Sequence, residues 1–145
     1  MVPIVLKAKL IAPCGMNCGI CKGHLRTTNR CPGCFAIGTR EVPTRVRCVL
    51  RRCTKRQTRF CFDCPTFPCQ RLEQLDKRYR TKYGMSEIEN LQFIRDGGVR
   101  AFLKREQRRW ISPQGILCVH DGKRYPAPLA RAARPGVTRC KGRAK

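Results

Sequence analysis

The stretch Cys14-Gly-Met-Asn-Cys-Gly-Ile-Cys21 is the first of several cysteine groups, and these groups decide the fold of the chain. The same half of the chain contains Cys31-Pro-Gly-Cys34 and Cys61-Phe-Asp-Cys-Pro-Thr-Phe-Pro-Cys69. In the spacing Cys-x2-Cys a tight turn brings two sulfurs to one side of the backbone. The pairs with this spacing are Cys18/Cys21, Cys31/Cys34 and Cys61/Cys64. Two such pairs complete a tetrahedral site, so three pairs in one stretch strongly favour metal binding.

Ten of the twelve cysteines lie in this half of the chain, and we predict all ten as metal ligands. They are Cys14, Cys18, Cys21, Cys31, Cys34, Cys48, Cys53, Cys61, Cys64 and Cys69. Two closed sites of four ligands each would hold about two zinc ions. One arrangement places Cys18, Cys21, Cys31 and Cys34 on one ion and four of the last five cysteines on the other. Interleaved pairing fits the spacing equally well.

The start of the chain bears on the compartment, because cysteines form disulfides in secreted proteins and stay reduced in the cytosol. The segment from Met1 to Leu10 has a short apolar stretch that Lys7 and Lys9 interrupt, which is unlike a secretion signal. No apolar run approaches the roughly 18 residues that a membrane helix needs. We therefore expect a cytoplasmic protein, without membrane contact, whose thiolates bind metal.

Charge is the second constraint on function. The 145 residues include 32 Lys and Arg against 9 Asp and Glu, which gives a net charge of +23. An excess of this size favours a polyanionic partner, and nucleic acid is the usual one.

Helical spacing begins after the last cysteine group. Leu72, Leu75, Tyr79 and Tyr83 recur on one face, and Gly84 is a natural end for that helix. The sequence Ser86-Glu-Ile-Glu89 has the form of a capping box and predicts a second helix that ends at Gly97-Gly98. A third helix is predicted from Val99 to Trp110, and short strands are predicted around Ile116 to Val119.

The expected fold class is a small metal-stapled α+β or irregular fold. A zinc-knuckle-rich N-terminal half precedes about three α-helices and a basic tail. The predicted divisions are a cysteine-rich region (1–69), a helical region packed on it (70–110), a degenerate ribbon-like segment (111–126) and a basic tail (127–145).

Basic residues within the cysteine-rich half predict a nucleic-acid surface. A short helix from Pro43 to about Gln57 would place Arg45, Arg52 and Arg56 on one side, with Arg59 beyond it. The full predicted set is Arg45, Arg47, Arg51, Arg52, Lys55, Arg56, Arg59, Lys104, Arg105, Arg108 and Arg109. Nearby phenylalanines are candidates for stacking on bases, although core packing is the better interpretation of Phe60 and Phe67.

Iron–sulfur ligation is the alternative cofactor chemistry, because four cysteines serve a cluster as well as zinc. The spacing Cys14-x3-Cys18-x2-Cys21 matches the signature of radical enzymes that use S-adenosylmethionine. Those enzymes need a large barrel domain, which a chain of this length without alternating strands and helices does not build.

These cysteine motifs resemble a family of bacterial and archaeal proteins of unknown function that are candidate zinc binders. The resemblance lies in Cys14 to Cys21, Cys31-Pro-Gly-Cys34, Cys48 to Cys53, and Cys61 to Cys69 followed by Arg71-Leu72. It covers about half of the chain, from Ala12 to Leu75. The resemblance implies metal binding and implies no reaction.

Some relatives carry a second metal-binding ribbon after the helices, with a cysteine pair behind a tryptophan. Here the corresponding stretch, Trp110-Ile-Ser-Pro-Gln-Gly115, has no cysteine pair. Cys118 and His120 remain as weak candidate ligands, but two ligands do not make a structural site.

RNA binding is the function that these features favour. The prediction is a zinc-stapled, ribosome-associated or otherwise RNA-bound protein, held to phosphate through Arg and Lys within a larger ribonucleoprotein assembly. No catalytic constellation is evident, because the cysteine-rich half contains Glu41 and Asp63 as its only carboxylates. Two alternatives remain: an iron–sulfur or metal-handling redox protein, and an adaptor that binds an acidic protein partner.

Overall fold

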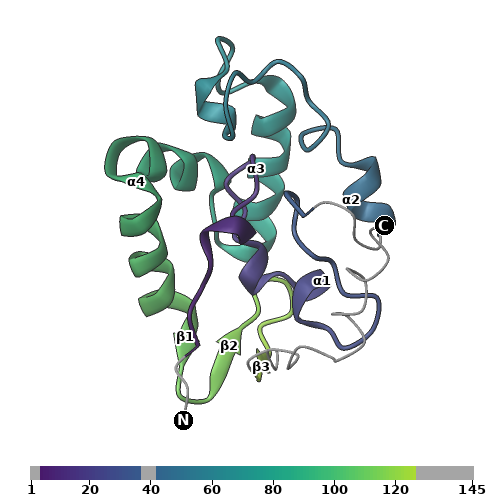
Figure 1. Cartoon of the computed structure of the whole chain (residues 1–145), viewed down its shortest axis with the longest axis vertical. Coiled ribbons are helices and arrows are strands. Elements are labelled where there is room, and N and C mark those ends of the chain that lie inside the picture. The colour runs from purple at the N-terminus through teal and green to yellow at the C-terminus, as the bar shows by residue number, and fades with distance from the viewer. Residues whose placement is uncertain (1–3, 37–41, 127–145) are drawn as a thin grey trace, which may run out of the picture.

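The computed structural model describes residues 4–36 and 42–126. It is a small α+β fold (Figure 1). Its helices are α1 (Lys22–Leu25), α2 (Pro43–Arg47), α3 (Gln70–Tyr83) and α4 (Glu87–Trp110), with short 3-10 helices η1 (Ala8–Leu10), η2 (Cys18–Ile20) and η3 (Cys61–Asp63). Its strands are β1 (Ile111–Ser112), β2 (Gly115–Leu117) and β3 (Arg124–Tyr125). The predicted basic tail (127–145) lies outside the described residues.

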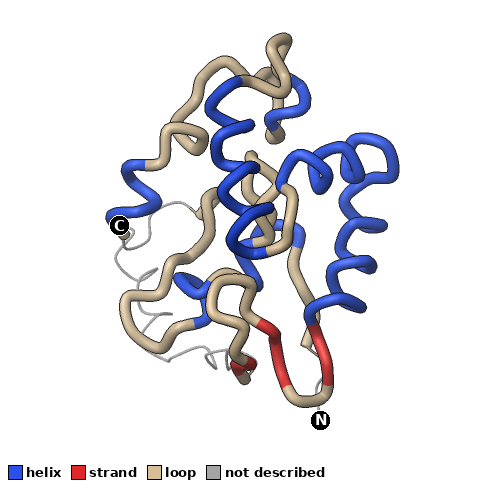
Figure 2. The backbone as a smooth tube through the Cα atoms, turned by 180° about the vertical axis from the view of Figure 1, so that it is seen from behind, coloured by secondary structure: helices blue, strands red, loops and turns tan. Residues whose placement is uncertain are grey.

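The cysteine-rich half is built mainly from turns, as Figure 2 shows by the long loops between its short helices. Each turn has a local cause. Asn17 caps η2 by accepting a hydrogen bond from the Gly19 amide at 2.9 Å. Ile11 and Asn17 form an antiparallel bridge that closes the loop containing Cys14. Short side-chain caps of this kind replace regular structure where no apolar periodicity exists.

Helix α2 is much shorter than predicted. It ends at Arg47, so the predicted helix from Pro43 to about Gln57 is wrong beyond its first turns. Val46 and Val49 are exposed at 43% and 50%, while Leu50 is buried, so the segment has no continuous apolar face to hold a longer helix against the core. The chain instead turns and carries Cys53 toward the later cysteines.

Helices α3 and α4 confirm the helical prediction. Helix α3 ends at Gly84, which adopts the left-handed conformation with φ of 63°. Ser86 caps α4 by accepting a hydrogen bond from the Glu89 amide at 3.0 Å. The two helices predicted on either side of Gly97-Gly98 follow each other directly, and Gly98 marks the break between them with φ of 87° and ψ of 163°.

The C-terminal part of the described chain forms a small antiparallel sheet in the order β1-β2-β3. Ile116 is the central residue, because it pairs with Ile111 on one side and Tyr125 on the other. The Val119 amide donates a hydrogen bond to the Ile20 carbonyl at 3.0 Å, which ties the end of this sheet to the cysteine-rich half.

One hydrophobic core joins all these parts. Helix α4 contacts α3, η1, η3 and β1, and Figure 1 shows the N-terminal segment beside it. The fully buried side chains come from the N-terminal loop, both long helices and the sheet; they include Ile11, Ile20, Leu72, Leu91 and Phe102. In the described part of the chain, no helix combines the length and the hydropathy that a membrane crossing requires.

Candidate metal centre

Four cysteines line one small cavity, which we call the thiol cavity. They are Cys53, Cys61, Cys64 and Cys69, and the remaining walls are Leu50, Arg56, Phe67 and Leu72. The cavity volume is about 20 Å³. That is room for about one water-sized particle, so the space would hold a single ion and little else.

Local turns place these four thiols around the cavity. Cys61 and Cys64 flank η3, and the Cys64 amide donates to the Cys61 carbonyl at 3.1 Å. Cys69 stands at the N-cap of α3, and the Cys53 amide donates to the Leu50 carbonyl at 3.3 Å. The predicted Cys61/Cys64 pair therefore opens on the same cavity as Cys53 and Cys69.

The electrostatics of the thiol cavity reflect this crowding. The pKa of the Cys61 thiol is raised to about 11, chiefly by burial; Arg56 opposes this shift, and the neighbouring Cys69, Cys53 and Cys64 add to it. Arg56 is held in place because its guanidinium donates to the carbonyls of Leu50, at 2.7 Å, and Arg51, at 3.1 Å. A fixed cation beside four thiols would offset the negative charge of a tetrathiolate site.

A second group, which we call the knuckle group, contains Cys14, Cys18 and Cys34. The pKa of the Cys34 thiol is lowered to about 7, first by its interaction with Cys18 and then by Arg51, Arg45 and Arg56, while burial opposes this shift. The interaction with Cys34 is the main cause that raises the pKa of Cys18, and burial is the next. For Cys14, burial is the main cause of a raised pKa. Whether Cys18 and Cys34 share a metal ion stays a prediction.

Glu87, in the first turn of α4, faces the knuckle group, and no sequence pattern pointed to it. The residue is fully buried, with 0% of its surface exposed. Burial raises the pKa of its carboxyl to about 8, while the Cys14 thiol opposes that shift. A Glu in a helix beginning with a capping box is normally a solvated residue, so its spacing gave no signal.

Cys21 and Cys31 form a third neighbourhood together with Cys118. Burial raises the pKa of Cys21, and the thiols of Cys31 and Cys118 raise it as well. Cys118 comes from the loop after β2, so the fold brings this weak candidate ligand back to the cysteine-rich half. Cys48 follows α2 and is half-buried.

His120 is engaged through both ring nitrogens. Its Nδ1 accepts a hydrogen bond from the Lys22 amide at 3.2 Å, so the neutral ring carries its proton on Nε2. That nitrogen donates to the Tyr79 hydroxyl at 2.7 Å. Metal binding by His120 would have to break one of these two bonds.

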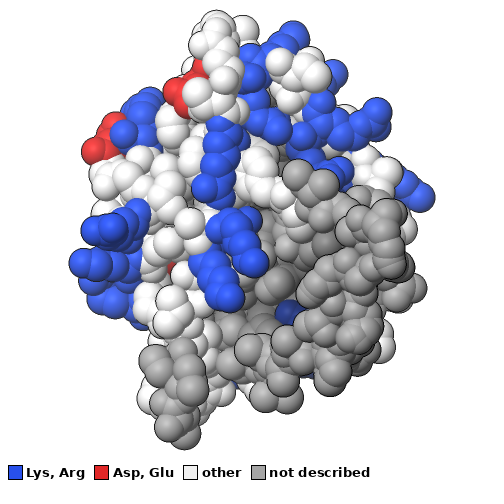
Figure 3. Space-filling view, in the orientation of Figure 1, with Lys and Arg blue, Asp and Glu red and all other residues white. Residues whose placement is uncertain are grey.

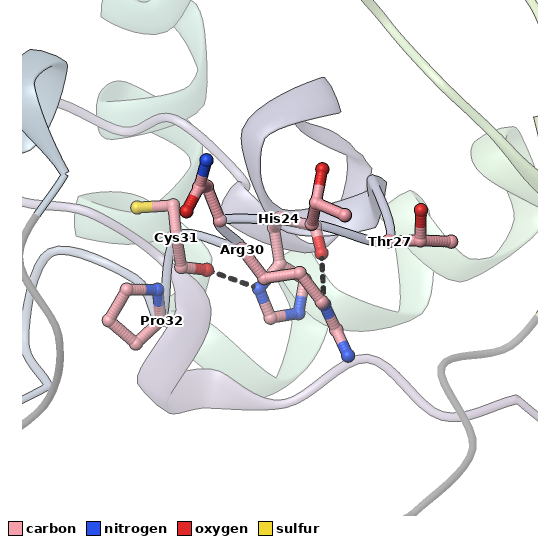
Figure 4. A pocket seen from close by; sticks show the side chains of 7 residues that line it. His24, Thr27, Arg30, Cys31 and Pro32 are labelled. Atoms are coloured by element: carbon pink, nitrogen blue, oxygen red, sulfur yellow. Dashed lines mark hydrogen bonds between the residues drawn. The ribbon is translucent and has the colours of Figure 1, made fainter.

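The loop between His24 and Pro32 lines an open cavity of about 620 Å³ (Figure 4). His24 donates from Nδ1 to the Cys31 carbonyl at 2.8 Å, which leaves Nε2 as the unprotonated nitrogen. Arg30 donates to the His24 carbonyl at 2.9 Å. In Figure 4 the Cys31 sulfur points away from the His24 ring, so these two side chains do not converge.

The described residues contain no ready-made coordination sphere. Across residues 4–36 and 42–126, no group of three or more His, Cys, Asp or Glu side chains is placed as ligands of one ion. The residue types of the thiol cavity nevertheless suit zinc, because four cysteines line a space of about 20 Å³ and zinc prefers thiolate ligands. Binding would require the thiols to converge until each sulfur lies about 2.3 Å from the metal.

The predicted nucleic-acid residues fall into two sets. Arg47, Arg52, Lys55, Lys104, Arg108 and Arg109 are exposed. Arg45 is buried, and the other four make internal contacts: Arg51, Arg56, Arg59 and Arg105. Arg59, for example, donates to the carbonyls of Ala8 and Ile11 and stacks over Phe35 and Phe60.

The phenylalanines near the cysteines pack inward. Phe60 is buried at 6% exposure and stacks on Phe62 with ring centroids 5.4 Å apart. Phe67 is partly buried against the core and lines the thiol cavity. Core packing is therefore the observed role of Phe60 and Phe67.

Comparison with protein families places part of the chain. The chain matches a family described as Protein of unknown function (DUF3795) over residues 10–74. This segment contains all ten clustered cysteines, whereas Glu87, α4 and the sheet lie outside it. Searches of curated proteins and of solved structures return no significant match to the chain.

Proposed function

We propose that this chain is a zinc-stapled RNA-binding protein, which binds ribosomal or other structured RNA. Its thiols would hold about two zinc ions, and its exposed Arg and Lys side chains would bind the phosphate backbone. Closed thiolate sites leave no open position for water or substrate, so the metal would have a structural role.

The observation that carries the RNA proposal is the separation of charge between surface and interior. Of the nine acidic residues, Asp76, Glu87 and Glu106 are buried. Among the described residues, the exposed acids are limited to Glu73, Glu89 and Asp96. The surface is therefore more basic than the composition suggests. Figure 3 shows Lys and Arg over α4, across the middle of the visible face and near the loop after α2.

The exposed cations, rather than the whole predicted set, would contact phosphate. Arg47 ends α2, Arg52 and Lys55 lie between α2 and η3, and Lys104 and Arg108 lie on α4. The internal arginines would act differently, because Arg51 and Arg56 lower the pKa of Cys34 and so favour thiolate.

The zinc part of the proposal is supported by the thiol cavity and by the family resemblance. Four cysteines from three separate turns line one space of ion size, and the guanidinium of Arg56, which lines it too, is held by backbone carbonyls. Iron–sulfur binding is a second candidate, favoured by the influence of Cys34, Cys21 and Cys14 on the pKa of Cys18. Visible absorption of anaerobically purified protein separates the two, since zinc sites are colourless.

The test of RNA binding is the salt dependence of affinity for a structured ribosomal RNA fragment and for single-stranded RNA. About ten phosphate contacts predict a log–log slope on the order of −7 on single strands. The variant R47Q/R52Q/K55Q should flatten the slope by about 2, since each lost contact contributes about 0.7. The control R47K/R52K/K55R keeps the charge and should keep the slope.

Two results would contradict the proposal. A flat salt response in the unsubstituted protein would remove phosphate contact as the source of affinity. Salt-sensitive binding to an acidic protein, with no preference for RNA, would identify the chain as an adaptor instead.

A further inference from the structure

Helix α3 carries a row of cations that the predicted nucleic-acid set does not contain. Arg71, Arg78 and Lys82 are exposed on it. With 3.6 residues per turn, their positions fall within about 40° of one another around the helix axis and extend over about 17 Å along it. We call these three residues the α3 stripe. Figure 2 shows α3 in the middle of the view from behind.

No acidic residue offsets the α3 stripe. On a helix, the neighbours of a side chain lie three and four residues away, and none of those positions around the stripe holds Asp or Glu. The exposed Glu73 is four residues from Lys77, on another side of α3. Buried Asp76 is engaged by Arg80 at 2.7 Å. Among the described residues, the cations of the stripe form no ion pair.

The α3 stripe does not serve the stability of its own helix. Arg78 and Lys82 are like charges four residues apart, which repel each other on a helix. Arg71 lies in the first turn of α3, where the positive end of the helix dipole disfavours a cation. Arg71 is also not among the side chains that line the thiol cavity, so it does not offset the charge of thiolates there. A polyanion on this face would compensate both costs.

Helix α4 adds a fourth cation at the C-terminal end of α3. The guanidinium of Arg109 donates to the Gly84 carbonyl at 3.1 Å and stacks over Trp110, 4.6 Å from the ring centroid. Gly84 is the C-cap of α3, and Arg109 is exposed. The end of α3 therefore has a cation whose position is fixed by two contacts.

The side chains of α3 indicate which polyanion fits this face. Its exposed residues are all charged or polar: Arg71, Glu73, Gln74, Lys77, Arg78, Arg80, Thr81 and Lys82. Its aromatic residues, Tyr79 and Tyr83, are half-buried and pack against the His120 ring. Proteins hold single strands by stacking bases on aromatic side chains, whereas they hold duplex RNA by its shape and its phosphates. The face therefore suits the backbone of a duplex.

We propose that the α3 stripe, with Arg109 at its end, binds the phosphate backbone of a duplex region of RNA. This inference rests on the proposed function, since it names the kind of RNA and adds a surface separate from the cations that follow α2. Contacts of this kind fix the position of the protein on the duplex and do not read its sequence.

The experiment measures the affinity of the full-length protein for an RNA duplex and for a single-stranded RNA of the same length, over a range of salt concentrations. The test variant is R71Q/R78Q/K82Q. The variant R71K/R78K/K82R keeps the charge of the stripe. The variant K7Q/K9Q/K123Q removes the same charge from exposed lysines outside α3. All substituted side chains are exposed, so each variant should keep the helical circular dichroism of the unsubstituted protein.

The proposal predicts that R71Q/R78Q/K82Q flattens the log–log salt slope on the duplex by about 2.7, since each phosphate contact on a duplex contributes about 0.9. On single-stranded RNA the same variant should change the slope by less than about 0.7, the value of one contact. Both control variants should keep the duplex slope to within about 0.9.

Three results would overturn the proposal. An unchanged duplex slope in R71Q/R78Q/K82Q would exclude the α3 stripe and leave the proposed function intact. Equal flattening in K7Q/K9Q/K123Q would show that net charge acts, rather than this face. Equal flattening on both RNAs would exclude the choice of a duplex. A flat salt response of the unsubstituted protein on both RNAs would instead remove the proposed function itself.

Discussion

Gly15 stands where the cysteine loop and helix α4 come closest. Its φ of 89° lies in the region that disfavours every side chain, and a Cβ there would also approach Leu91 Cγ at 2.9 Å. Leu91 is fully buried, so it has little room to move. The residue therefore has two separate reasons to be glycine: its backbone conformation and the space around it.

Substitution of Gly15 by alanine should lower the free energy of unfolding by at least about 2 kcal/mol, because the left-handed backbone costs about 1–2 kcal/mol before any clash. Gly84→Ala is the matched control, since Gly84 has φ of 63° and a methyl group added there would meet nothing within 4 Å. We expect the control to lose about 1 kcal/mol. Chemical denaturation of the metal-loaded variants measures both, and equal losses would contradict the close contact.

At the scale of elements, Asp76 connects α3 to the start of α4 through hydrogen bonds. Its Oδ1 accepts hydrogen bonds from the Ser86 hydroxyl at 2.6 Å and from the Ile88 amide at 2.9 Å. Its Oδ2 accepts one from Arg80 at 2.7 Å. One carboxylate on α3 thus satisfies the orphan donors at the start of α4, together with the Ser86 cap.

Asp76→Asn should lower the free energy of unfolding by about 2 kcal/mol at neutral pH, because it removes charge-assisted hydrogen bonds from a buried site. Burial alone would raise the pKa of Asp76, but the bonds from Ile88, Ser86 and Arg80 outweigh it and keep the pKa below the ordinary value. A depressed folded-state pKa gives stability that is present above about pH 4 and is lost as pH falls through the folded-state pKa.

The measurement is the stability difference between the unsubstituted protein and Asp76→Asn, followed by denaturation from neutral pH to below about pH 4. The difference should shrink toward zero at the acid end. Asp96→Asn, at an exposed position beside Arg95, is the control and should change stability by no more than about 0.5 kcal/mol. A difference that does not vary with pH would show that Asp76 acts by packing rather than by charge.

Sequence patterns predicted these elements where the cause was local. The Ser86 cap, the glycine end of α3 and the break at Gly98 each depend on a few adjacent residues, and all three are confirmed. The helix predicted from Pro43 is too long. Val46 and Val49 follow a helical pattern, but the core does not cover them and both are exposed. The hydrogen bonds of Asp76 connect two helices, so no local sequence pattern could predict them.

At the scale of the whole molecule, the fold separates its charges. Three acidic side chains are buried: Asp76, Glu87 and Glu106. Most Lys and Arg side chains of the described residues are at the surface. Composition predicted the basic surface, and spacing predicted the Cys61/Cys64 pair. Neither could predict that Arg51 and Arg59 bond backbone carbonyls of earlier segments, or that Glu87 interacts with Cys14, because these contacts join segments far apart in the sequence.

Contacts between distant segments also explain why the spacing of the cysteines could not predict which cysteines lie together. Cys53 reaches the thiol cavity only because the chain turns after α2, and Cys118 reaches Cys21 because the sheet folds back. Spacing identifies pairs within a turn, whereas the choice between turns is made by tertiary packing.

Metal content is the measurement that tests this account most directly. The full-length protein would be purified without oxygen, and its zinc, iron and acid-labile sulfide would be determined beside those of Cys61→Ser. The account predicts about two zinc per chain, no visible absorption, and about one zinc in Cys61→Ser. Metal-free protein that is fully folded, or iron with sulfide in place of zinc, would contradict it.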